Sequence, residues 1–276
     1  MKYKTIFKTS FLTACLVSAS AMHLARADQL QDIKTKKTLV CGVLGDSVPL
    51  GYQDPATRKT VGLDVDVCTD IAKDLGVSVE IVPVSVDARI PALQTGRVDI
   101  VAAALGYTKE RATQIDFSSA YYQTPITVLV QNNSGIEKFA QFAGKQVSAI
   151  RGSTPELYAR QQLIGANVVT FDDAPSAFMA LMQNKAQGMA MSEPAAVRFR
   201  NRSKGKTHFL EETLHYEPEC IGVKKGETAL LDAVNKTLDK MERNGRMQAI
   251  WDKWYGPSTE YNMVRAKKVT PIADFQ

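Results

Sequence analysis

Histidine, cysteine and tryptophan are scarce in this chain of 276 residues, which holds three His, four Cys and two Trp. The cysteines lack the paired short spacing of metal sites, and His208 and His215 are the histidines that follow residue 27. We therefore expect no metal site and no cofactor. A set of His and Cys side chains suited to nucleophilic catalysis is also missing, which argues against enzyme classes that depend on one.

Long apolar runs are absent beyond residue 27, so we expect no membrane-spanning helix there. At the start of the chain, three lysines precede an apolar or small stretch from Phe11 to Leu24, and no acidic residue comes before Asp28. This is the layout of a secretory signal peptide. The small residues of Ala25-Arg26-Ala27 predict cleavage after Ala27, which implies export to the periplasm.

A second interpretation of the same segment is a lipoprotein signal. The residues Leu12-Thr13-Ala14-Cys15 resemble a lipoprotein cleavage box, in which Cys15 is acylated and retained as a membrane anchor. Cleavage there leaves few apolar residues after Lys8, which favours the ordinary signal peptide.

Excess positive charge is also absent from the chain once the signal is removed. Loss of residues 1–27 takes away four basic residues and no acidic one, so the net charge falls from +5 to +1. Nucleic acids and anionic membranes need clustered Lys and Arg, so we expect neither as a partner. The basic residues Arg198, Arg200, Arg202, Lys204 and Lys206 fall beside a turn at Gly205, which indicates a solvated helix end and loop.

Three cysteines remain in the mature chain: Cys41, Cys68 and Cys220. Disulfides persist in exported proteins. Cys41 lies in an expected strand and Cys68 in the helix that follows and packs on it. A disulfide between them and a pair of buried thiols in contact both fit this placement.

Short apolar runs alternate with amphipathic segments after the signal, a pattern that predicts an α/β fold. The expected strands cover residues 38–43, 78–82, 98–103, 127–131, 146–150, 167–171, 187–191 and 221–224. The expected helices cover residues 64–75, 155–163, 175–183 and 227–254, the last one broken near Asn244-Gly245. A turn at residues 132–135 separates a first run of α/β units from a smaller second one, which predicts two lobes with a ligand cleft between them.

Several motifs occur in a recognisable order along the mature chain. They comprise Gly62-Leu63-Asp64-Val65-Asp66-Val67, Arg89-Ile90-Pro91-Ala92-Leu93-Gln94-Thr95-Gly96-Arg97-Val98-Asp99, Thr108-Lys109-Glu110-Arg111, Asp116-Phe117-Ser118 and Arg151-Gly152-Ser153-Thr154. The set resembles the bacterial extracellular solute-binding proteins of family 3, which bind polar amino acids and related solutes. The stretch from Trp251 to Gly256 is similar to the branch that binds aspartate and glutamate.

This resemblance implies a two-lobed fold of the type II periplasmic binding proteins, with a two-strand hinge. Lobe one is expected to comprise residues 28–130 and 221–276, the latter including a C-terminal tail, and lobe two residues 131–220. The implied function is capture of an amino acid or related small carboxylate for the membrane permease of an ABC transporter, by a protein that is a monomer and not an enzyme.

The resemblance also implies ligand-binding residues. Arg111 matches the family arginine that grips the ligand's carboxylate, as a planar guanidinium can do through two parallel hydrogen bonds. Ser153 and Thr154 stand between a strand and a helix, where backbone amides can receive the same carboxylate from lobe two. Arg89 is expected to reach a second carboxylate or to form a salt bridge with Asp87 or Asp99. The set is completed by Ala104 and Gly106.

Departures from the family pattern bear on the choice of ligand. Ser192 stands where relatives place an aspartate for the ligand's ammonium group, so either the neighbouring Glu193 substitutes for it or the ligand lacks that group. Gly106 replaces a Ser or Thr. Ser47 and Val86 replace aromatic residues of the proteins that bind basic amino acids, which disfavours lysine and arginine as ligands.

An enzyme on the same scaffold is the alternative. Some relatives resemble cyclohexadienyl dehydratase, in which a pocket carboxylate serves as general acid, and Glu193 is the candidate for that role here.

Overall fold

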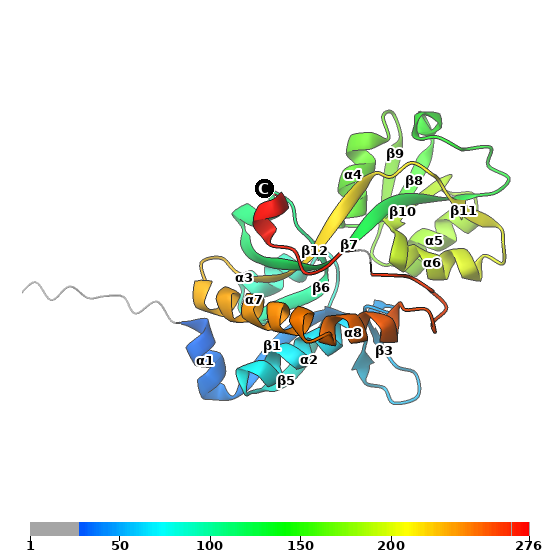
Figure 1. The fold of residues 1–276 in the computed structure, drawn as a ribbon. Coiled ribbons are helices and arrows are strands. Elements are labelled where there is room, and N and C mark those ends of the chain that lie inside the picture. Colours follow the sequence, from blue (N-terminus) through cyan, green and yellow to red (C-terminus); the bar gives the residue numbers. More distant parts are fainter. Residues whose placement is uncertain (1–27, 266, 276) are drawn as a thin grey trace, which may run out of the picture.

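A computed structural model describes residues 28–265 and 267–275. The predicted signal peptide and Cys15 lie outside these residues. The described chain forms two α/β lobes joined by two long strands, β7 (Ile115–Gln131) and β12 (His215–Lys224), which run from one lobe into the other (Figure 1). Within the described part, no helix combines the length and apolar character needed to span a membrane.

Lobe one holds most of the elements at the two ends of the chain. They are α1 (Gln29–Lys36), β1 (Thr38–Leu44), β2 (Asp46–Ser47), β3 (Gly51–Gln53), β4 (Thr60–Val61), α2 (Leu63–Leu75), β5 (Ser78–Val84), α3 (Arg89–Gln94), β6 (Ile100–Gly106), η1 (Arg111–Thr113), α7 (Thr228–Arg243), α8 (Arg246–Trp254) and η3 (Ile272–Phe275). Lobe two holds η2 (Phe139–Phe142), β8 (Gln146–Ile150), α4 (Thr154–Gln162), β9 (Asn167–Phe171), α5 (Ala174–Met182), β10 (Gly188–Ser192), α6 (Glu193–Arg202) and β11 (Thr207–Phe209).

One mixed sheet passes through both lobes in the order β5-β1-β6-β12-β7-β10-β8-β9, with β11 also paired to β7. The strands β5, β1 and β6 are parallel to one another, as are β10, β8 and β9. The two joining strands are antiparallel to each other and lie in the middle of the order. The predicted α/β, two-lobed fold is thus confirmed.

Helices cover both faces of each part of the sheet, so its strands are apolar on both sides. On β1, Leu39, Cys41 and Val43 face a core formed with α1, α2, α7 and α8. Val40 and Leu44 face the opposite core, which includes side chains of α3. This two-sided burial explains why the strands are continuous apolar runs in the sequence rather than alternating ones.

Each joining strand, with the residue just before it, contributes side chains to the apolar core of one lobe along part of its length and to the core of the other lobe along the rest. On β7, Tyr122 belongs to a core of lobe one and Ile126 to a core of lobe two. Around β12, Leu214 packs in lobe two and Cys220 in lobe one. The change on β7 lies between Tyr122 and Ile126, and the change at the other joining strand lies between Leu214 and Cys220; the lobe boundaries expected at positions 130 and 220 stay predictions.

The expected helices and strands are found, with shifts at their ends. The segment 227–254 does divide into α7 and α8 near Gly245, which is left-handed with φ 78°. The elements not expected are α1, α3, η1, η2, η3, the small sheet of β2 to β4, β11, and the first halves of β7 and β12; of α6, only the end near Arg198 was expected.

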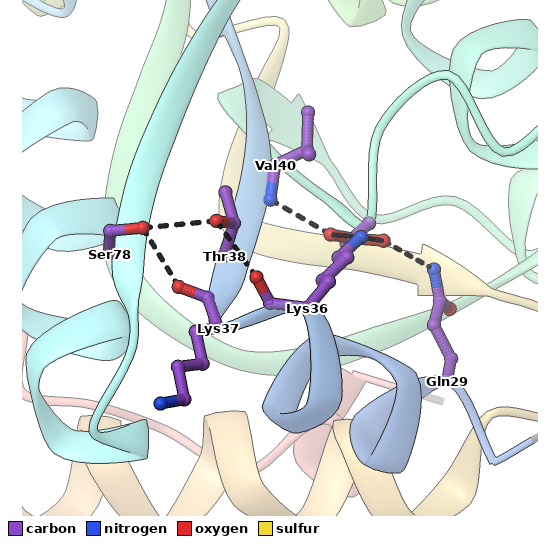
Figure 2. A network of polar contacts seen from close by, with 7 residues as sticks. Gln29, Lys36, Lys37, Thr38, Val40 and Ser78 are labelled. Atoms are coloured by element: carbon purple, nitrogen blue, oxygen red, sulfur yellow. Dashed lines mark hydrogen bonds and ion pairs between the residues drawn. The ribbon is translucent and has the colours of Figure 1, made fainter.

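A buried carboxylate anchors the N-terminal helix to the sheet (Figure 2). Asp99 accepts hydrogen bonds from the Lys36 ammonium at 2.8 Å, the Val40 amide at 2.8 Å and the Gln29 amide group at 3.1 Å. Beside it, the Ser78 hydroxyl donates to the Lys37 carbonyl at 2.8 Å. These contacts fix α1 against the start of β1.

A disulfide joins Cys41 of β1 to Cys68 of α2. It ties the first strand to the helix that covers it, across a sequence separation of 27 residues. Cys220 is a free, buried thiol on β12, and its burial raises its pKa well above the usual value.

The C-terminal tail runs along the joining strand β7 (Figure 1). The amide of Ala120 donates to the Thr270 carbonyl at 2.8 Å, and the amide of Thr270 donates back at 3.0 Å. Arg265 donates to the Tyr121 carbonyl at 2.9 Å. The tail ends in η3, which packs with lobe one near Phe117.

Candidate ligand-binding cleft

A small cavity of about 50 Å³ lies between the lobes. Lobe one and β12 contribute Leu44, Ser47, Leu50, Val86, Arg89, Ala104, Glu217 and Glu219. Lobe two contributes Ile150, Ser153, Thr154, Pro155, Ala190, Met191, Ser192 and Ala195. We call this space the inner cavity.

A wider hollow of about 420 Å³ adjoins the inner cavity, because Arg89 and Ser153 line both spaces. Its lining also includes Arg111 and Gly152, and we call it the outer hollow. Arg89 therefore stands at the boundary between the two spaces, whereas Arg111 lines the outer hollow and reaches the inner cavity through its bond to Thr154.

Arg111 reaches from lobe one across to lobe two. Its Nη1 donates to the Thr154 hydroxyl at 2.8 Å and to the Gly106 carbonyl at 2.7 Å, and its Nη2 donates to the Gly152 carbonyl at 2.9 Å. Burial lowers the pKa of Arg111, and the buried carboxyl groups of Glu217 and Glu219 partly offset that effect. The structure thus brings Arg111 and Thr154 together, as the predicted carboxylate site requires.

Arg89 is buried and donates to backbone carbonyls. Its Nε bonds to the Val86 carbonyl at 2.7 Å, its Nη1 to the carbonyls of Ala103 and Ala104, and its Nη2 to the Gly152 carbonyl at 3.3 Å. Burial lowers the pKa of Arg89 to about 9, so it stays charged at neutral pH.

The expected salt bridge of Arg89 with Asp87 or Asp99 is wrong. Asp99 is bound by Lys36 instead, and Asp87 accepts from the Ser85 hydroxyl at 2.5 Å. Backbone carbonyls accept the hydrogen bonds of Arg89 instead. Arg89 is the first residue of α3, and its Nη1 donates to the Ala103 carbonyl of β6 at 3.0 Å.

The start of α4 presents lobe two's polar groups to the cleft. Ser153 is the N-cap, and its hydroxyl accepts from the Glu156 amide at 3.1 Å. Glu156 in turn accepts from the Gly152 amide at 2.8 Å. Thr154 is the first residue of the helix, where the helix dipole favours an anion; because Pro155 has no N–H and the Glu156 amide is capped, the Thr154 amide is the donor that the first turn offers.

Two buried glutamates on β12 form the acidic side of the inner cavity. Glu217 and Glu219 are spaced two residues apart, so they point to the same face of the strand. Burial raises the pKa of Glu217, while a hydrogen bond from Thr154 and the charges of Arg111 and Arg89 hold it down. Burial and the neighbouring Glu217 raise the pKa of Glu219 well above its usual value.

Gly106 makes room for this acidic pair. A Cβ atom at position 106 would lie 1.8 Å from Glu217 Oε1, so a side chain there would displace the carboxyl group. Gly106 does not line the inner cavity, but its carbonyl fixes Arg111.

Asp64, near the start of α2, is buried behind Ala104, which lines the inner cavity. Its carboxyl group accepts from the Tyr121 hydroxyl at 2.6 Å and from the Ala104 amide at 3.2 Å. Burial raises its pKa to about 7. Ala104 adopts a left-handed conformation with φ 46°, which its bonds to Asp64 and Arg89 hold in place.

Gly62, the first residue of the motif that contains Asp64, is required by its surroundings. Its φ is 147°, and a Cβ atom there would lie 2.1 Å from the Leu50 carbonyl oxygen. The close approach lets that carbonyl accept from the Asp64 amide at 3.0 Å. This contact fixes Leu50 in the lining of the inner cavity.

Ser192 lines the inner cavity at the end of β10, whereas Glu193 does not. Ser47 and Val86 are also in the lining, and none of the lining residues within the described chain is aromatic. The structure thus leaves Glu193 outside the group formed by Ser153, Thr154, Ala104 and Arg89.

Sequence reasoning missed Glu217 and Glu219 as cleft residues and Asp64 as the buried group behind Ala104. The spacing of two glutamates at alternate positions of a strand was the available signal, and Gly106 was the matching small residue. Asp64 belonged to a recognised motif, but nothing in that motif marks its carboxyl group as buried.

The sequence profile of the bacterial extracellular solute-binding proteins, family 3, matches residues 39–257. A glutamine-binding protein of an ABC transporter, GlnH from Bacillus subtilis (strain 168), is 31% identical over 258 residues, 91% of this chain and 94% of that protein. The L-cystine-binding protein TcyJ of Escherichia coli (strain K12) is 28% identical over 245 residues, 88% and 92% of the two chains.

Solved structures agree with these relatives. A P235GK mutant of ArgBP from T. maritima matches with a TM-score of 0.76 and 27% identity, covering 82% of this chain and 99% of that one. An ancestral amino acid-binding protein, a precursor of cyclohexadienyl dehydratase, also has a TM-score of 0.76, with 31% identity and the same coverage of 82% and 99%. The chain described here belongs to the bacterial extracellular solute-binding proteins of family 3.

Proposed function

We propose that this protein is the periplasmic binding component of an ABC-type uptake system, and that it captures an amino acid or a related small carboxylate between its lobes. The observation that carries the proposal is the meeting of the Arg111 guanidinium with Thr154 and the start of α4 across the cleft. A guanidinium and a helix N-terminus both favour a carboxylate.

Closure follows from this arrangement. Guanidinium groups carry five N–H donors, and Arg111 uses three of them on Gly106, Thr154 and Gly152. The two remaining donors have no partner within the described chain and bind the ligand's carboxylate from lobe one, while the Thr154 amide at the start of α4 binds it from lobe two. A ligand held by both lobes stabilises the closed state through contacts that an open state lacks.

The inner cavity limits the ligand class. Its lining offers no aromatic ring for a cationic side chain in the described chain, so lysine and arginine are disfavoured. Arg89 is the candidate partner for a second acidic group of the ligand, although four backbone carbonyls already accept hydrogen bonds from most of its N–H donors.

Export and assembly complete the proposal. Residues 1–27 act as a cleaved signal peptide, and the mature protein is a monomer with lobe one in residues 28–130 and 221–276 and lobe two in residues 131–220. The closed form then delivers its ligand to a membrane permease.

An enzymatic function is the second candidate, because buried carboxyl groups with raised pKa values line the inner cavity. A carboxyl group that is uncharged near neutral pH can serve as a general acid, and Glu217 and Glu219 suit this role better than Glu193, which lies outside the cavity. Turnover of prephenate or arogenate by the purified protein tests this candidate.

A thermal-shift screen tests the proposed binding function. The panel comprises the common amino acids, L-cystine, dicarboxylates and keto acids, each added to the purified protein. A ligand that binds the folded state at about 100 times its Kd raises the free energy of unfolding by about 2.7 kcal/mol. If no member of the panel raises the melting temperature, the proposed function is wrong.

A further inference from the structure

Glu219 carries an unsatisfied carboxyl oxygen in the inner cavity. The side chain is 1% exposed, and within the described chain Oε2 has no hydrogen-bond partner. Leaving such an atom unpaired away from water costs free energy, so buried polar groups nearly always have a partner. The atom therefore needs a group that the protein itself does not supply.

The surroundings of Glu219 define that group. Glu217 lies on the same strand face and adds a second carboxyl group, so the pair attracts positive charge and favours hydrogen-bond donors. Arg89 and Thr154 line the same small cavity, and Arg111 bonds to that threonine. The cleft thus places carboxylate-binding groups and carboxyl groups within reach of one small molecule.

The residues of lobe two reinforce this assignment. Ser192 lines the cavity with a neutral hydroxyl, which cannot balance the charge of an ammonium group. Glu193 adjoins it in sequence but stays outside the cavity. The acidic groups that face the bound molecule therefore come from β12 and not from the start of α6.

We infer that Glu219, with Glu217 beside it, binds the ammonium group of the ligand, so that the ligand is an α-amino acid and not a keto or hydroxy acid. This inference rests on the proposed binding function and adds the chemical class of the ligand. The ammonium group supplies the donors that Oε2 lacks, while the carboxylate of the same molecule meets Arg111 and the start of α4.

Binding of matched molecules to the unaltered protein tests the inference first. Calorimetry compares L-alanine with L-lactate and L-glutamate with L-2-hydroxyglutarate, since each pair differs in whether an ammonium or a hydroxyl is present; L-glutamine and L-cystine are measured alongside. We expect an amino acid to bind at least about tenfold more tightly than its hydroxy acid. A hydroxy acid that binds as tightly as its amino acid overturns the inference, yet leaves the proposed function standing.

Glu219→Gln tests the role of the residue. Glutamine keeps the size and can still donate a hydrogen bond, but it cannot take on the negative charge that a bound ammonium group would stabilise. We expect the affinity for the best amino acid of the panel to fall by about 10- to 100-fold. Unchanged affinity overturns the inference alone, whereas absence of any binding to the unaltered protein overturns the proposed function as well.

Two further variants serve as controls. Glu211→Gln makes the same chemical change at an exposed position and should leave the affinity unchanged. Glu219→Asp retains the charge with a shorter reach and should fall between the unaltered protein and Glu219→Gln. An aspartate variant as weak as the glutamine variant, with both still folded by circular dichroism, contradicts a role based on charge.

Discussion

Replacement of Arg111 by alanine is the most direct test of the proposed cleft. The side chain crosses from lobe one to lobe two and bonds to Thr154 and Gly152. Removing it deletes the proposed carboxylate partner on lobe one and two of the polar contacts that join the lobes. We expect ligand binding to be lost while both lobes remain folded, because the apolar cores do not include this residue.

The size of the effect follows from the donors of the guanidinium. The three bonds to Gly106, Thr154 and Gly152 leave two N–H donors for the ligand, and a hydrogen bond between charged groups contributes about 1.5–3 kcal/mol. Loss of both therefore weakens binding by about 3–6 kcal/mol, or roughly 10²- to 10⁴-fold. Arg111→Lys keeps the charge but loses the paired geometry, so we expect a loss of about tenfold.

Isothermal titration calorimetry with the best ligand of the thermal-shift panel measures both variants. Urea unfolding without ligand serves as the control for folding. Arg111→Ala with an affinity within about twofold of the unaltered protein would refute the assignment of Arg111 as the carboxylate partner, whatever the ligand is.

Three further predictions concern stability. Because burial raises the pKa of Asp64 to about 7, the folded state keeps a proton that the unfolded state loses above about pH 4. The free energy of unfolding, measured by urea titration at several pH values, should therefore fall by up to about 4 kcal/mol as the pH rises to 7 and above, relative to the Asp64→Asn variant. Asp99→Ala should cost about 2–4 kcal/mol by the same assay, because it strips three donors of their acceptor, whereas exposed Asp239→Ala should cost under about 0.5 kcal/mol. Replacing Cys41 and Cys68 together by alanine should lower stability by about 3–4 kcal/mol, a loss that a reducing agent should reproduce in the unaltered protein alone.

Local patterns were sufficient to predict much of the fold. The helix of Leu63–Leu75 repeats apolar residues at helical spacing and ends at Gly76, which adopts φ 73°. The first half of β7 was missed because its residues include Ser118, Ser119 and two tyrosines, which do not form an apolar run. Pairing with β12 and the core around Tyr121 make it a strand, and neither partner is adjacent in sequence.

The candidate site, like the fold, could be predicted from the sequence only in part. Arg111, Ser153 and Thr154 lie in recognisable motifs, and the structure brings them together between the lobes. Glu217 and Glu219 carry no motif, and glutamates near the exposed Tyr216 are typical of a solvated strand. Their burial arises from strands β6 and β7 and from the opposite lobe, all far away in the sequence.

The C-terminal tail offers a way to observe the two lobes in motion. Phe275, at its end, and Tyr158 of α4 line one hollow of about 430 Å³, although they belong to different lobes. A donor and an acceptor fluorophore attached at positions 275 and 158 would start close together and separate when the lobes part. Energy transfer between such dyes would then convert each capture of a solute into an optical signal, so the protein could serve as the basis of a biosensor.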